Sequence, residues 1–495
     1  MTPKRSLTDY LAEHAAREPE RTALYFRDRA YTYREVEEAA ARCRGALAAH
    51  GIRAGDRVAL LMSDSPEAVF AFLGIIGLAA VAVPCNTQMP ADGLAYVLKD
   101  SEAKLVVVSP EYAGHDFSTP RVRGDDLLKA APVPLAAFER DTPCLIVYTS
   151  GSTGQPKGAV HRHGHLPCSV EAVAKRTLEL RPEDRLFSVA RLFFAYGLGN
   201  SITVPLGGGA STILLAERPT PALVAEVFRT HRPTIFFGVP TMFRMLIEHA
   251  RQGNALDASS LRFSVSAGEV LPAATWNEWK ALTGTEILES IGTTELLYAF
   301  IHNHPRRNRP GSSGQVLDGY ECRLTDDAGQ LVQGAGRGHL HVRGGSAIQH
   351  YLNKPEQTAA AIRDGWVRTG DVYRRDADGY FWFEGRSDDL FKCSGMWVSP
   401  MEVEEAVARH PAVLETAVIA EPDANGGTIP AAYVMLRPGF AASEAEILAE
   451  AAKALPRFKQ PKRVHFMDQL PRTATGKVQR FKLRQLSKVR GRSPN

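Results

Sequence analysis

Short apolar runs that alternate with helical stretches are the feature that most restricts the fold of this chain. Strand-like runs occur at residues 57–62, 104–108, 185–189, 211–215 and 234–237, and helical stretches such as residues 222–232 and 241–250 separate them. Alternating apolar strands and helices favour an α/β fold with a largely parallel sheet. The chain has no short-period repeat, which argues against a solenoid.

The length of the chain and the change in its sequence pattern along its length predict more than one domain. Its 495 residues, 44% of them hydrophobic, supply ample core. Beyond Gly314 turn signals become denser, and residues 326–329 and 376–381 are typical of hairpins in a β-rich subdomain. After residues 385–390, helical stretches (403–408 and 443–455) mix with strand-like runs (413–420 and 431–436). About a hundred residues of this mix predict a small α+β domain.

Composition excludes several classes of protein. A formal charge of +4 is too small to indicate nucleic acid as the main ligand. Six cysteines without a Cys-x-x-Cys pair indicate reduced thiols, and the first ten residues contain no apolar run of the kind that begins a secretory signal. The most apolar segment, residues 69–84, is shorter than a membrane span of ~20 residues and predicts a buried helix leading into a strand. We therefore expect a cytoplasmic protein that binds neither nucleic acid nor a membrane.

The string Tyr-Thr-Ser-Gly-Ser-Thr-Gly-Gln-Pro-Lys-Gly, residues 148–158, follows a strand-like run at residues 143–148. Its glycines allow the backbone to approach a ligand closely, and its hydroxyls and amide N–H groups are donors for phosphate oxygens. Lys157 adds a positive charge. The string does not match Gly-x-x-x-x-Gly-Lys-Ser/Thr, so it is not a Walker A loop. Considered alone, a short Ser/Gly run is equally well interpreted as a surface loop.

Four later strings carry further chemistry. They are Ser266-Ala-Gly-Glu269, Glu289-Ser-Ile-Gly-Thr-Thr-Glu295, Arg368-Thr-Gly-Asp371 and Pro471-Arg-Thr-Ala-Thr-Gly-Lys477. The last three have ordinary interpretations, which are a helix N-cap, a turn and a solvated lysine, respectively. Together with residues 148–158, and in this order, they resemble the adenylate-forming superfamily, which includes acyl-CoA synthetases, aryl-CoA ligases, peptide-synthetase adenylation domains and luciferases. The resemblance covers residues 148–480, and the preceding residues fit the same fold.

The resemblance implies a two-domain enzyme. Residues 1–386 would form a large N-terminal adenylate-forming domain, and residues 387–495 a small mobile α+β C-terminal domain that rotates about a hinge at Asp388. The enzyme would be a monomer or homodimer that uses ATP, Mg²⁺, coenzyme A and a small carboxylic acid. The carboxylate is itself the first nucleophile, so no Ser-His-Asp triad is needed. Acyl-adenylate and pyrophosphate form first, and a thiol then displaces AMP.

The resemblance also assigns roles to residues. Lys477, Thr294 and Lys392 are the implied catalytic residues, Lys477 because a fixed ammonium eases the encounter of two anions. Glu295 is the implied Mg²⁺ ligand, and a single carboxylate suffices when phosphates supply the other oxygens. The implied ATP-binding residues are Thr149, Ser150, Gly151, Ser152, Thr153, Gly154, Lys157, Gly268, Glu269, Glu289, Ser290, Ile291, Gly292, Thr293, Thr294, Asp371, Arg386 and Lys477.

The acid itself is indicated by Ala190-Arg-Leu-Phe-Phe-Ala-Tyr-Gly-Leu-Gly-Asn200 together with residues 290–295, which resemble the benzoate-CoA ligase branch. The implied pocket residues are Phe194, Ala195, Tyr196, Gly197, Gly268, Ile291, Gly292 and Tyr298, with Phe194 and Gly395 lining the coenzyme A tunnel. A small apolar pocket with an aromatic wall suits a benzoate-like acid. Alternatively, some of Phe193, Phe194 and Tyr196 are ordinary core aromatics.

This sequence departs from the branch at Ser290, where Gly is expected, and at Tyr298, where His is expected. A hydroxy-, amino- or halobenzoate, or an alicyclic or short aliphatic acid, therefore remains open. Two other functions remain open: a stand-alone adenylation enzyme that loads a carrier protein, and a catalytically silent binding protein. His161, His163 and His165 alternate and would share one face of a strand, where they could bind zinc, although no Cys or acidic partner follows at ligand spacing.

Overall fold

A computed structural model describes residues 6–115, 118–149, 155–393, 395–423, 427–472 and 478–490, with side chains to residue 487. The chain divides into two compact units. The first unit comprises Met1–Arg323, His341–Thr369 and Ala377–Phe381, and the second comprises Leu324–Leu340, Gly370–Asp376 and Trp382–Asn495. The domain boundary after residue 386 and the hinge at Asp388 stay predictions.

A nine-stranded sheet forms the larger part of the first unit, in the order β15-β14-β13-β12-β11-β9-β10-β1-β2. The six strands from β13 to β1 in this order pair in parallel, as the alternating pattern predicts, and the strands at both ends pair antiparallel. The strands are β1 (Thr22–Phe26), β2 (Arg29–Thr32), β9 (Arg185–Ser188), β10 (Ser211–Leu214), β11 (Ile235–Gly238), β12 (Phe263–Ser266), β13 (Ile287–Gly292), β14 (Ala299–His302) and β15 (Gln315–Val316).

A second sheet of the first unit has six strands in the order β6-β5-β3-β4-β7-β8. They are β3 (Arg57–Leu61), β4 (Val81–Pro84), β5 (Leu105–Val108), β6 (Arg121–Arg123), β7 (Pro143–Thr149) and β8 (Lys157–Arg162). The pairs are parallel except for β7 and β8, which are antiparallel with Thr149 opposite Lys157. This register brings together Thr149 and Lys157, two residues of the Gly- and Ser-rich string that the structure describes.

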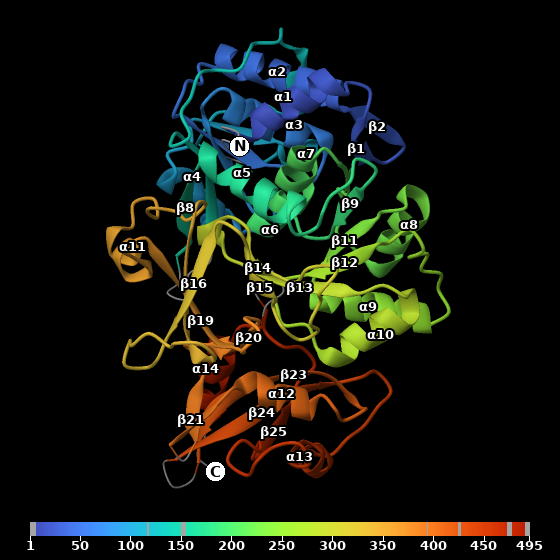
Figure 1. Ribbon diagram of the computed structural model, residues 1–495, viewed down its shortest axis with the longest axis vertical. Coiled ribbons are helices and arrows are strands. Elements are labelled where there is room, and N and C mark those ends of the chain that lie inside the picture. The colour runs from blue at the N-terminus through green and yellow to red at the C-terminus, as the bar shows by residue number, and fades with distance from the viewer. Residues whose placement is uncertain are drawn as a thin grey trace. The chain divides into compact units, whose positions relative to one another are not determined.

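Helices pack against both sheets of the first unit. They are α1 (Leu7–Arg17), α2 (Tyr33–Ala49), α3 (Pro66–Gly77), α4 (Ala91–Asp100), α5 (Leu166–Ser169), α6 (Ala195–Leu198), α7 (Val204–Gly208), α8 (Pro221–His231), α9 (Pro240–Arg251), α10 (Ala273–Thr283) and α11 (Pro355–Ala361). Every residue of α3 except the partly buried Glu67 is buried, and β4 follows, so the predicted helix-to-strand segment is confirmed. Figure 1 shows α8, α9 and α10 beside β11, β12 and β13, where the Phe236 ring packs against the rings of Phe228, Phe243 and Trp279.

The predicted β-rich segment forms a five-stranded sheet whose residues are divided between the two units. Its strands are β16 (Tyr320–Thr325), β17 (Gly336–Gly344), β18 (Ile362–Arg363), β19 (Trp366–Arg375) and β20 (Phe381–Arg386). The turn at residues 326–329 separates β16 from β17, and residues 376–380 separate β19 from β20. Both turns lie where the Asp- and Gly-rich sequences predict them.

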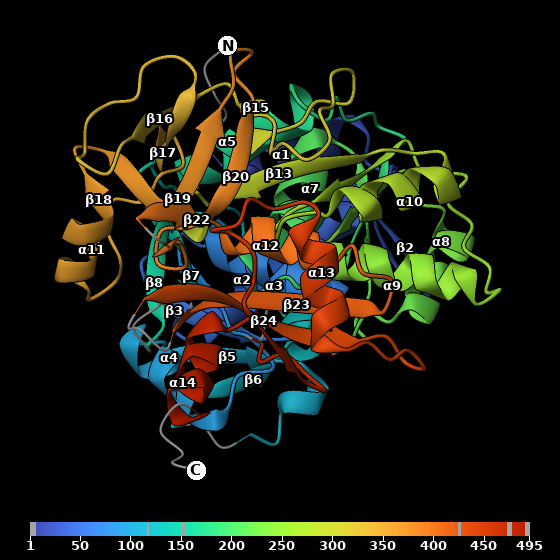
Figure 2. The same cartoon turned by 90° about the horizontal axis from the view of Figure 1, so that it is seen from below.

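The rest of the second unit is a small α+β structure, as predicted. The strands β23 (Val413–Pro422), β24 (Thr428–Leu436) and β25 (Arg463–Phe466) form one sheet, and β21 (Phe391–Cys393) pairs with β22 (Met396–Val398). The helices α12 (Pro400–Val407) and α13 (Glu444–Ala452) pack on the face that carries Val418, whereas α14 (Arg480–Arg490) packs on the face that carries Ile419. Figure 2 shows the sheet between these helices. Neighbouring strand residues point to opposite faces, so one short sheet builds two apolar cores.

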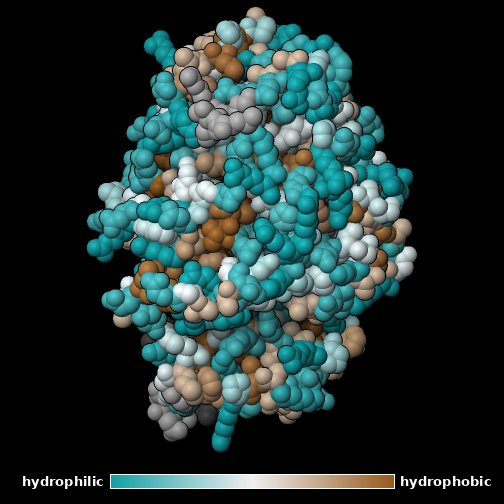
Figure 3. All heavy atoms as spheres, viewed as in Figure 1, coloured by the Kyte–Doolittle hydropathy of each residue, from teal (hydrophilic) through white to brown (hydrophobic). Residues whose placement is uncertain are grey.

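Apolar segments of the described chain are short. Among the described residues no helix has both the length and the apolar character needed to cross a membrane. Figure 3 shows a largely hydrophilic face on which brown apolar residues occur in small scattered groups.

Candidate active site

The end of the β7–β8 hairpin carries Lys157, the implied phosphate-binding lysine. Its ammonium nitrogen lies 4.6 Å from the centre of the Tyr351 ring, over the ring face. Tyr148 donates a hydrogen bond of 2.7 Å to Asp100, and Tyr96 donates one of 3.2 Å to the Pro156 carbonyl oxygen. These contacts hold both strands of the hairpin close to α4. The predicted site residues Ser150, Gly151, Ser152, Thr153 and Gly154 lie outside the described residues.

The loop after β12 and the end of β13 lie side by side. Ser266 pairs with Glu289 across the two parallel strands, so Gly268 and Glu269 lie near Ser290, Ile291 and Gly292 at the carboxyl ends of the strands. Gly268 adopts a φ of +89°, a conformation that L side chains rarely adopt. The loop can therefore turn over the end of the sheet, where ligands of parallel α/β folds bind.

Glu289 and Thr293 frame the segment between β13 and β14. The Glu289 carboxylate accepts a hydrogen bond of 2.8 Å from the Gly311 N–H, and 8% of the residue is exposed. The Thr293 hydroxyl oxygen is buried and has no hydrogen-bond partner among the described residues. A buried hydroxyl without a partner is uncommon in proteins. Among the described residues Thr293 therefore keeps hydrogen-bonding capacity at a position where the resemblance implies ATP binding.

Glu295 and Thr294 are held by two segments that lie far away in the sequence. The Tyr351 hydroxyl donates a hydrogen bond of 2.5 Å to the Glu295 carboxylate. The His161 Nε2 lies 2.8 Å from the Thr294 carbonyl oxygen, and because a carbonyl only accepts, this nitrogen carries the proton. The Ile348 N–H donates 2.9 Å to the Glu295 carbonyl oxygen. The structure thus brings Lys157, Thr294 and Glu295 into one neighbourhood through Tyr351 and β8.

The alternating histidines do not share a strand face, contrary to expectation. The strand β8 ends at Arg162, and His163–His165 forms a 3₁₀ turn instead. His163 stacks on Phe138 with ring centres 3.8 Å apart, and neither of its ring nitrogens has a partner among the described residues. Burial lowers the pKa of His163 and of His165 to about 4, and that of His161 to about 3, so all three are neutral at pH 7. They are core residues.

Within the described ranges no group of three or more His, Cys, Asp and Glu side chains is arranged to hold a metal ion. A nucleotide-bound Mg²⁺ takes most of its ligands from phosphate oxygens and water, so one protein carboxylate suffices. Glu295 offers one carboxylate, which Tyr351 orients. The Thr293 hydroxyl, which has no partner among the described residues, lies two residues away in the sequence.

The predicted acid pocket is built on α6 and on the residue before β14. The rings of Tyr196 and Tyr298 lie nearly parallel, with centres 6.3 Å apart and an angle of 21° between their planes. Gly199 allows this approach, because a Cβ there would lie 2.2 Å from the Tyr298 ring. Gly197 also has no space for a side chain, because a Cβ there would lie 2.0 Å from the Arg191 carbonyl oxygen. Two tyrosines about a hundred residues apart in the sequence therefore form one aromatic wall.

The aromatic residues beside this wall differ in exposure. Phe193 is buried, whereas Phe194, Ala195 and Tyr196 are partly exposed. The rings of Phe193 and Phe194 meet edge to face with centres 4.4 Å apart. Phe193 is therefore the core aromatic of the string, and Phe194 is placed so that it could line a pocket or a tunnel.

Asn200 and Ser188 were not singled out in the sequence, although both contact the predicted pocket. The Tyr298 hydroxyl donates a hydrogen bond to the Asn200 side-chain oxygen, and the Asn200 amide nitrogen donates 3.0 Å to the Ser188 hydroxyl. Asn200 is completely buried. In the sequence Asn200 is one of several polar residues in a helical segment, and nothing there reveals its partners.

In the second unit, Asp371 on β19 and Arg386 at the end of β20 form an ion pair. The Arg386 Nη1 lies 2.7 Å from the Asp371 carboxylate, whose side chain is 8% exposed. Gly370 adopts a φ of +77°, and a Cβ there would lie 2.9 Å from the Arg386 guanidinium. The Ser387 N–H donates 2.9 Å to the Gly370 carbonyl oxygen. The two residues, both implied to bind ATP, are thus adjacent.

Lys392 and Gly395 lie on the β21–β22 hairpin of the second unit. Lys392 pairs with Trp397 across the hairpin, and its ammonium lies 4.8 Å from the centre of the indole ring. Gly395 adopts a φ of +78°, and, its chain neighbours aside, a Cβ there would meet no atom of the described residues within 4 Å. The described residues therefore leave space beside Gly395. Asp388 precedes this hairpin, in the segment between β20 and β21.

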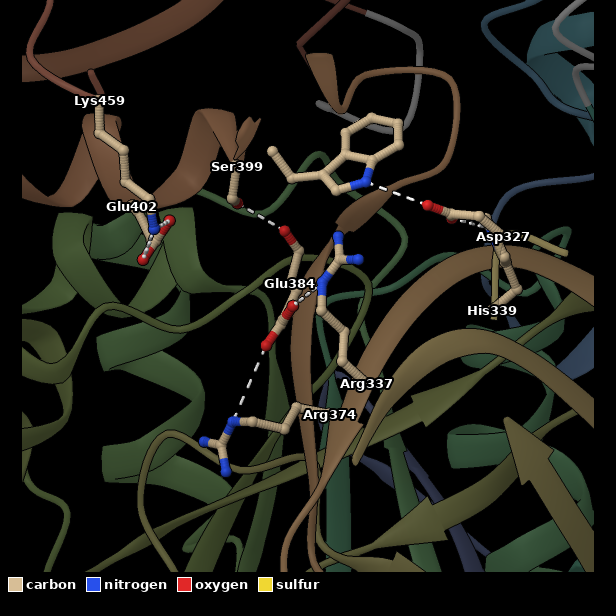
Figure 4. A network of polar contacts seen from close by, with 9 residues as sticks. Asp327, Arg337, His339, Arg374, Glu384, Ser399, Glu402 and Lys459 are labelled. Atoms are coloured by element: carbon tan, nitrogen blue, oxygen red, sulfur yellow. Dashed lines mark hydrogen bonds and ion pairs between the residues drawn. The ribbon is translucent and has the colours of Figure 1, made fainter. Parts of the chain in front are cut away.

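A polar network fixes the hairpin within the second unit (Figure 4). The Trp397 indole N–H donates 3.1 Å to Asp327, and Glu384 lies between the guanidinium groups of Arg337 and Arg374. The Ser399 hydroxyl donates to the Glu384 carbonyl oxygen at 2.5 Å. Lys477, the remaining predicted catalytic residue, lies outside the described residues.

Comparison with known proteins identifies the family. Residues 11–352 match the model of the AMP-binding enzymes, and residues 402–477 match the model of the AMP-binding enzyme C-terminal domain. The chain belongs to the AMP-binding enzyme family. The predicted membership of the adenylate-forming superfamily and the predicted fold class are confirmed.

Similarity within the family extends over nearly the whole chain. The benzoate–CoA ligase of Thauera aromatica is 39% identical over 92% of this chain and 90% of its own length. The 3-hydroxybenzoate–CoA ligase of Aromatoleum sp. is 37% identical over 93% of this chain and 92% of its own length. The crystal structure of the anthranilate CoA ligase AuaEII in complex with anthranoyl-AMP is 36% identical and has a TM-score of 0.93, covering 98% of both chains.

Proposed function

We propose that this chain activates a benzoate-like carboxylic acid with ATP and transfers the acyl group to coenzyme A, releasing AMP and pyrophosphate. The stacked pair Tyr196 and Tyr298 is the observation that carries the choice of an aromatic acid. Two nearly parallel rings offer flat apolar surface to another ring, whereas a long acyl chain would need an extended tunnel. Relatives named as aryl-CoA ligases over more than 90% of the chain support the same reaction class.

The reaction proceeds in two steps. A carboxylate oxygen of the acid attacks the α-phosphorus of ATP, and the bond to pyrophosphate breaks. The thiol of coenzyme A, losing its proton, then attacks the carbonyl carbon of the acyl-adenylate, and AMP leaves. Both steps concentrate negative charge, so fixed positive charges and hydrogen-bond donors lower their barriers.

In this proposal the residues around Thr294 bind the phosphates. Lys157 and the hydroxyls of Thr293 and Thr294 contact phosphate oxygens, and the carboxylate of Glu295 holds Mg²⁺. When bound, Mg²⁺ supplies positive charge next to the phosphates. The contacts of Tyr351 support these roles, because its hydroxyl hydrogen-bonds the Glu295 carboxylate and its ring lies beneath the Lys157 ammonium.

Residues of the second unit complete the proposed machinery. Asp371 accepts hydrogen bonds from the ribose hydroxyls, a task for a carboxylate that Arg386 keeps charged and oriented. Lys477 contacts the acid and the α-phosphate in the first step. Lys392 and the tip at Gly395 serve the second step, in which the pantetheine arm passes a residue without a side chain.

The direct test is a panel of benzoate, hydroxybenzoates, aminobenzoates and short aliphatic acids, assayed for pyrophosphate release and for AMP and thioester formation. Coenzyme A-dependent thioester formation from an aromatic acid is the expected result. Acyl-AMP that is not transferred to coenzyme A would indicate a carrier-protein substrate instead. No turnover with any aromatic acid would contradict the proposal.

The two half-reactions can be separated with Lys477→Ala. We expect this variant to lose formation of the acyl-adenylate and to keep thioester formation from supplied acyl-adenylate, because its ammonium serves only the first step. The conservative variant Lys477→Arg keeps the charge and should retain part of the first half-reaction. Equal loss of both half-reactions in Lys477→Ala would contradict the division of labour.

A further inference from the structure

A buried amide lies behind the aromatic wall of the proposed acid pocket. Asn200 is completely buried, and both ends of its amide are occupied. Its oxygen accepts a hydrogen bond from the Tyr298 hydroxyl, and its nitrogen donates to Ser188 at 3.0 Å. The amide thus joins Tyr298 of the wall to Ser188 at the end of β9.

The surroundings leave the Tyr298 ring little freedom. Gly199, the residue before Asn200, lies directly against the ring, where even a Cβ would approach to 2.2 Å. The ring also stacks with Tyr196. The Tyr298 side chain is therefore held by the hydrogen bond of its hydroxyl and by the contacts of its ring with Gly199 and Tyr196. A phenol held in this way offers an incoming acid its carbon atoms, because its polar atom is already paired.

We propose that Asn200 is a positioning residue for substrate selection: it holds the Tyr298 hydroxyl away from the acid, so that the wall presents an apolar surface to the substrate ring. This inference rests on the proposed function. Ser188 supports Asn200, because its hydroxyl accepts from the amide nitrogen and also from the Ala190 N–H at 3.2 Å. In the structure the amide oxygen is directed toward Tyr298.

Hydrogen-bond pairing predicts the direction in which Asn200→Leu changes the substrate preference. In Asn200→Leu the Tyr298 hydroxyl loses its acceptor inside the protein, and a buried hydroxyl without a partner is costly. A hydroxyl or amino group on the substrate ring can then pair with it, whereas unsubstituted benzoate cannot. The ratio of kcat/KM for benzoate to that for the best hydroxy- or aminobenzoate should fall about tenfold, chiefly through KM.

A matched control and a double variant separate positioning from general destabilisation. Thr203→Val removes a buried hydroxyl from the same helical segment, where Thr203 contacts Ser169 and the Gly199 carbonyl oxygen, and should leave the ratio unchanged. Asn200→Leu/Tyr298→Phe removes the freed hydroxyl as well, and should restore the benzoate preference. A merely structural role for Asn200 predicts no such restoration.

An absorption measurement tests the geometry independently of turnover. A tyrosine that donates a hydrogen bond absorbs at longer wavelength than one without an acceptor. The near-ultraviolet difference spectrum should therefore show a blue shift in Asn200→Leu, and no such shift when Asn200→Leu is introduced into Tyr298→Phe. An unchanged spectrum, or a ratio that moves equally in Thr203→Val, would overturn the inference. Inactivity of the unaltered enzyme with every aromatic acid would instead overturn the proposed function.

Discussion

Tyr351→Phe is the substitution that most directly tests the arrangement around Glu295. The tyrosine hydroxyl donates a hydrogen bond of 2.5 Å to the Glu295 carboxylate, and its ring lies 4.6 Å from the Lys157 ammonium. Phenylalanine keeps the ring and therefore the cation–π contact, worth about 0.5–1 kcal/mol at an exposed site. Only the hydrogen bond is lost. The substitution therefore tests the hydrogen bond to Glu295, the proposed Mg²⁺ ligand, without removing the contact between the ring and Lys157.

The magnitude follows from the charge of the acceptor. A hydrogen bond to a charged group contributes about 1.5–3 kcal/mol, and each 1.4 kcal/mol corresponds to about tenfold in binding. Removing a group that orients a metal ligand typically weakens metal binding by about 10–100-fold. We therefore expect the Mg²⁺ concentration for half-maximal pyrophosphate release to increase about tenfold or more. The rate at saturating Mg²⁺ should stay close to that of the unaltered enzyme.

Tyr320→Phe is the matched control for this experiment. The Tyr320 hydroxyl is 2.7 Å from the Ser346 hydroxyl, which in turn donates 2.7 Å to the Leu296 carbonyl oxygen, next to Glu295 in the sequence. This control also loses a buried tyrosine hydroxyl but leaves the carboxylate untouched. The assay is a Mg²⁺ titration of both variants at saturating acid and ATP. An unchanged Mg²⁺ requirement in Tyr351→Phe, or equal increases in both variants, would refute the reasoning.

Two further predictions concern other charged groups. Arg386→Ala should increase the KM for ATP about tenfold, because Asp371 loses the guanidinium 2.7 Å away. Arg386→Lys should restore part of the affinity for ATP. An unchanged KM for ATP in Arg386→Ala would show that this ion pair does not serve nucleotide binding. Burial raises the pKa of Asp64 to about 6, although Arg191 at 3.7 Å opposes the shift. Because this folded-state value exceeds the unfolded value of about 3.9, the contribution of Asp64 to stability is full below pH 4 and is lost as pH rises through about 6. In urea unfolding, the free energy of unfolding of Asp64→Asn should therefore increase relative to that of the unaltered protein by up to about 3 kcal/mol between pH 4 and pH 8. A difference between the two proteins that does not depend on pH would count against this account.

The sequence indicated the elements of the fold because their signals are local. Residues 57–62 and 104–108 are apolar runs of strand length, and the structure has β3 and β5 there. The alternating histidines mark the limit of such patterns. A spacing of two predicts a shared strand face only if the strand continues, and β8 ends at Arg162, so His163 packs on Phe138 instead.

The candidate site was predicted mainly from short strings whose order resembles a known family. Those strings named Lys157, Thr294 and Glu295 but not the residues that hold them. Tyr351 and His161 come from distant segments, and neither residue has a local pattern that reveals its hydrogen-bond partner. A side chain that acts on a distant neighbour is visible only once the chain has folded.

The sequence by itself determined the alternating α/β fold, the small α+β region and the chemical types available at each string, because periodicity and residue type are properties of neighbours along the chain. Only the tertiary structure decided which of these groups meet. It brings the Tyr298 ring beside the Tyr196 ring. It also brings the Tyr298 hydroxyl within hydrogen-bond distance of Asn200, about a hundred residues earlier in the sequence. Hydrogen bonds and ring stacking depend on distances of a few ångströms between remote segments, and the crossovers of the sheet set those distances.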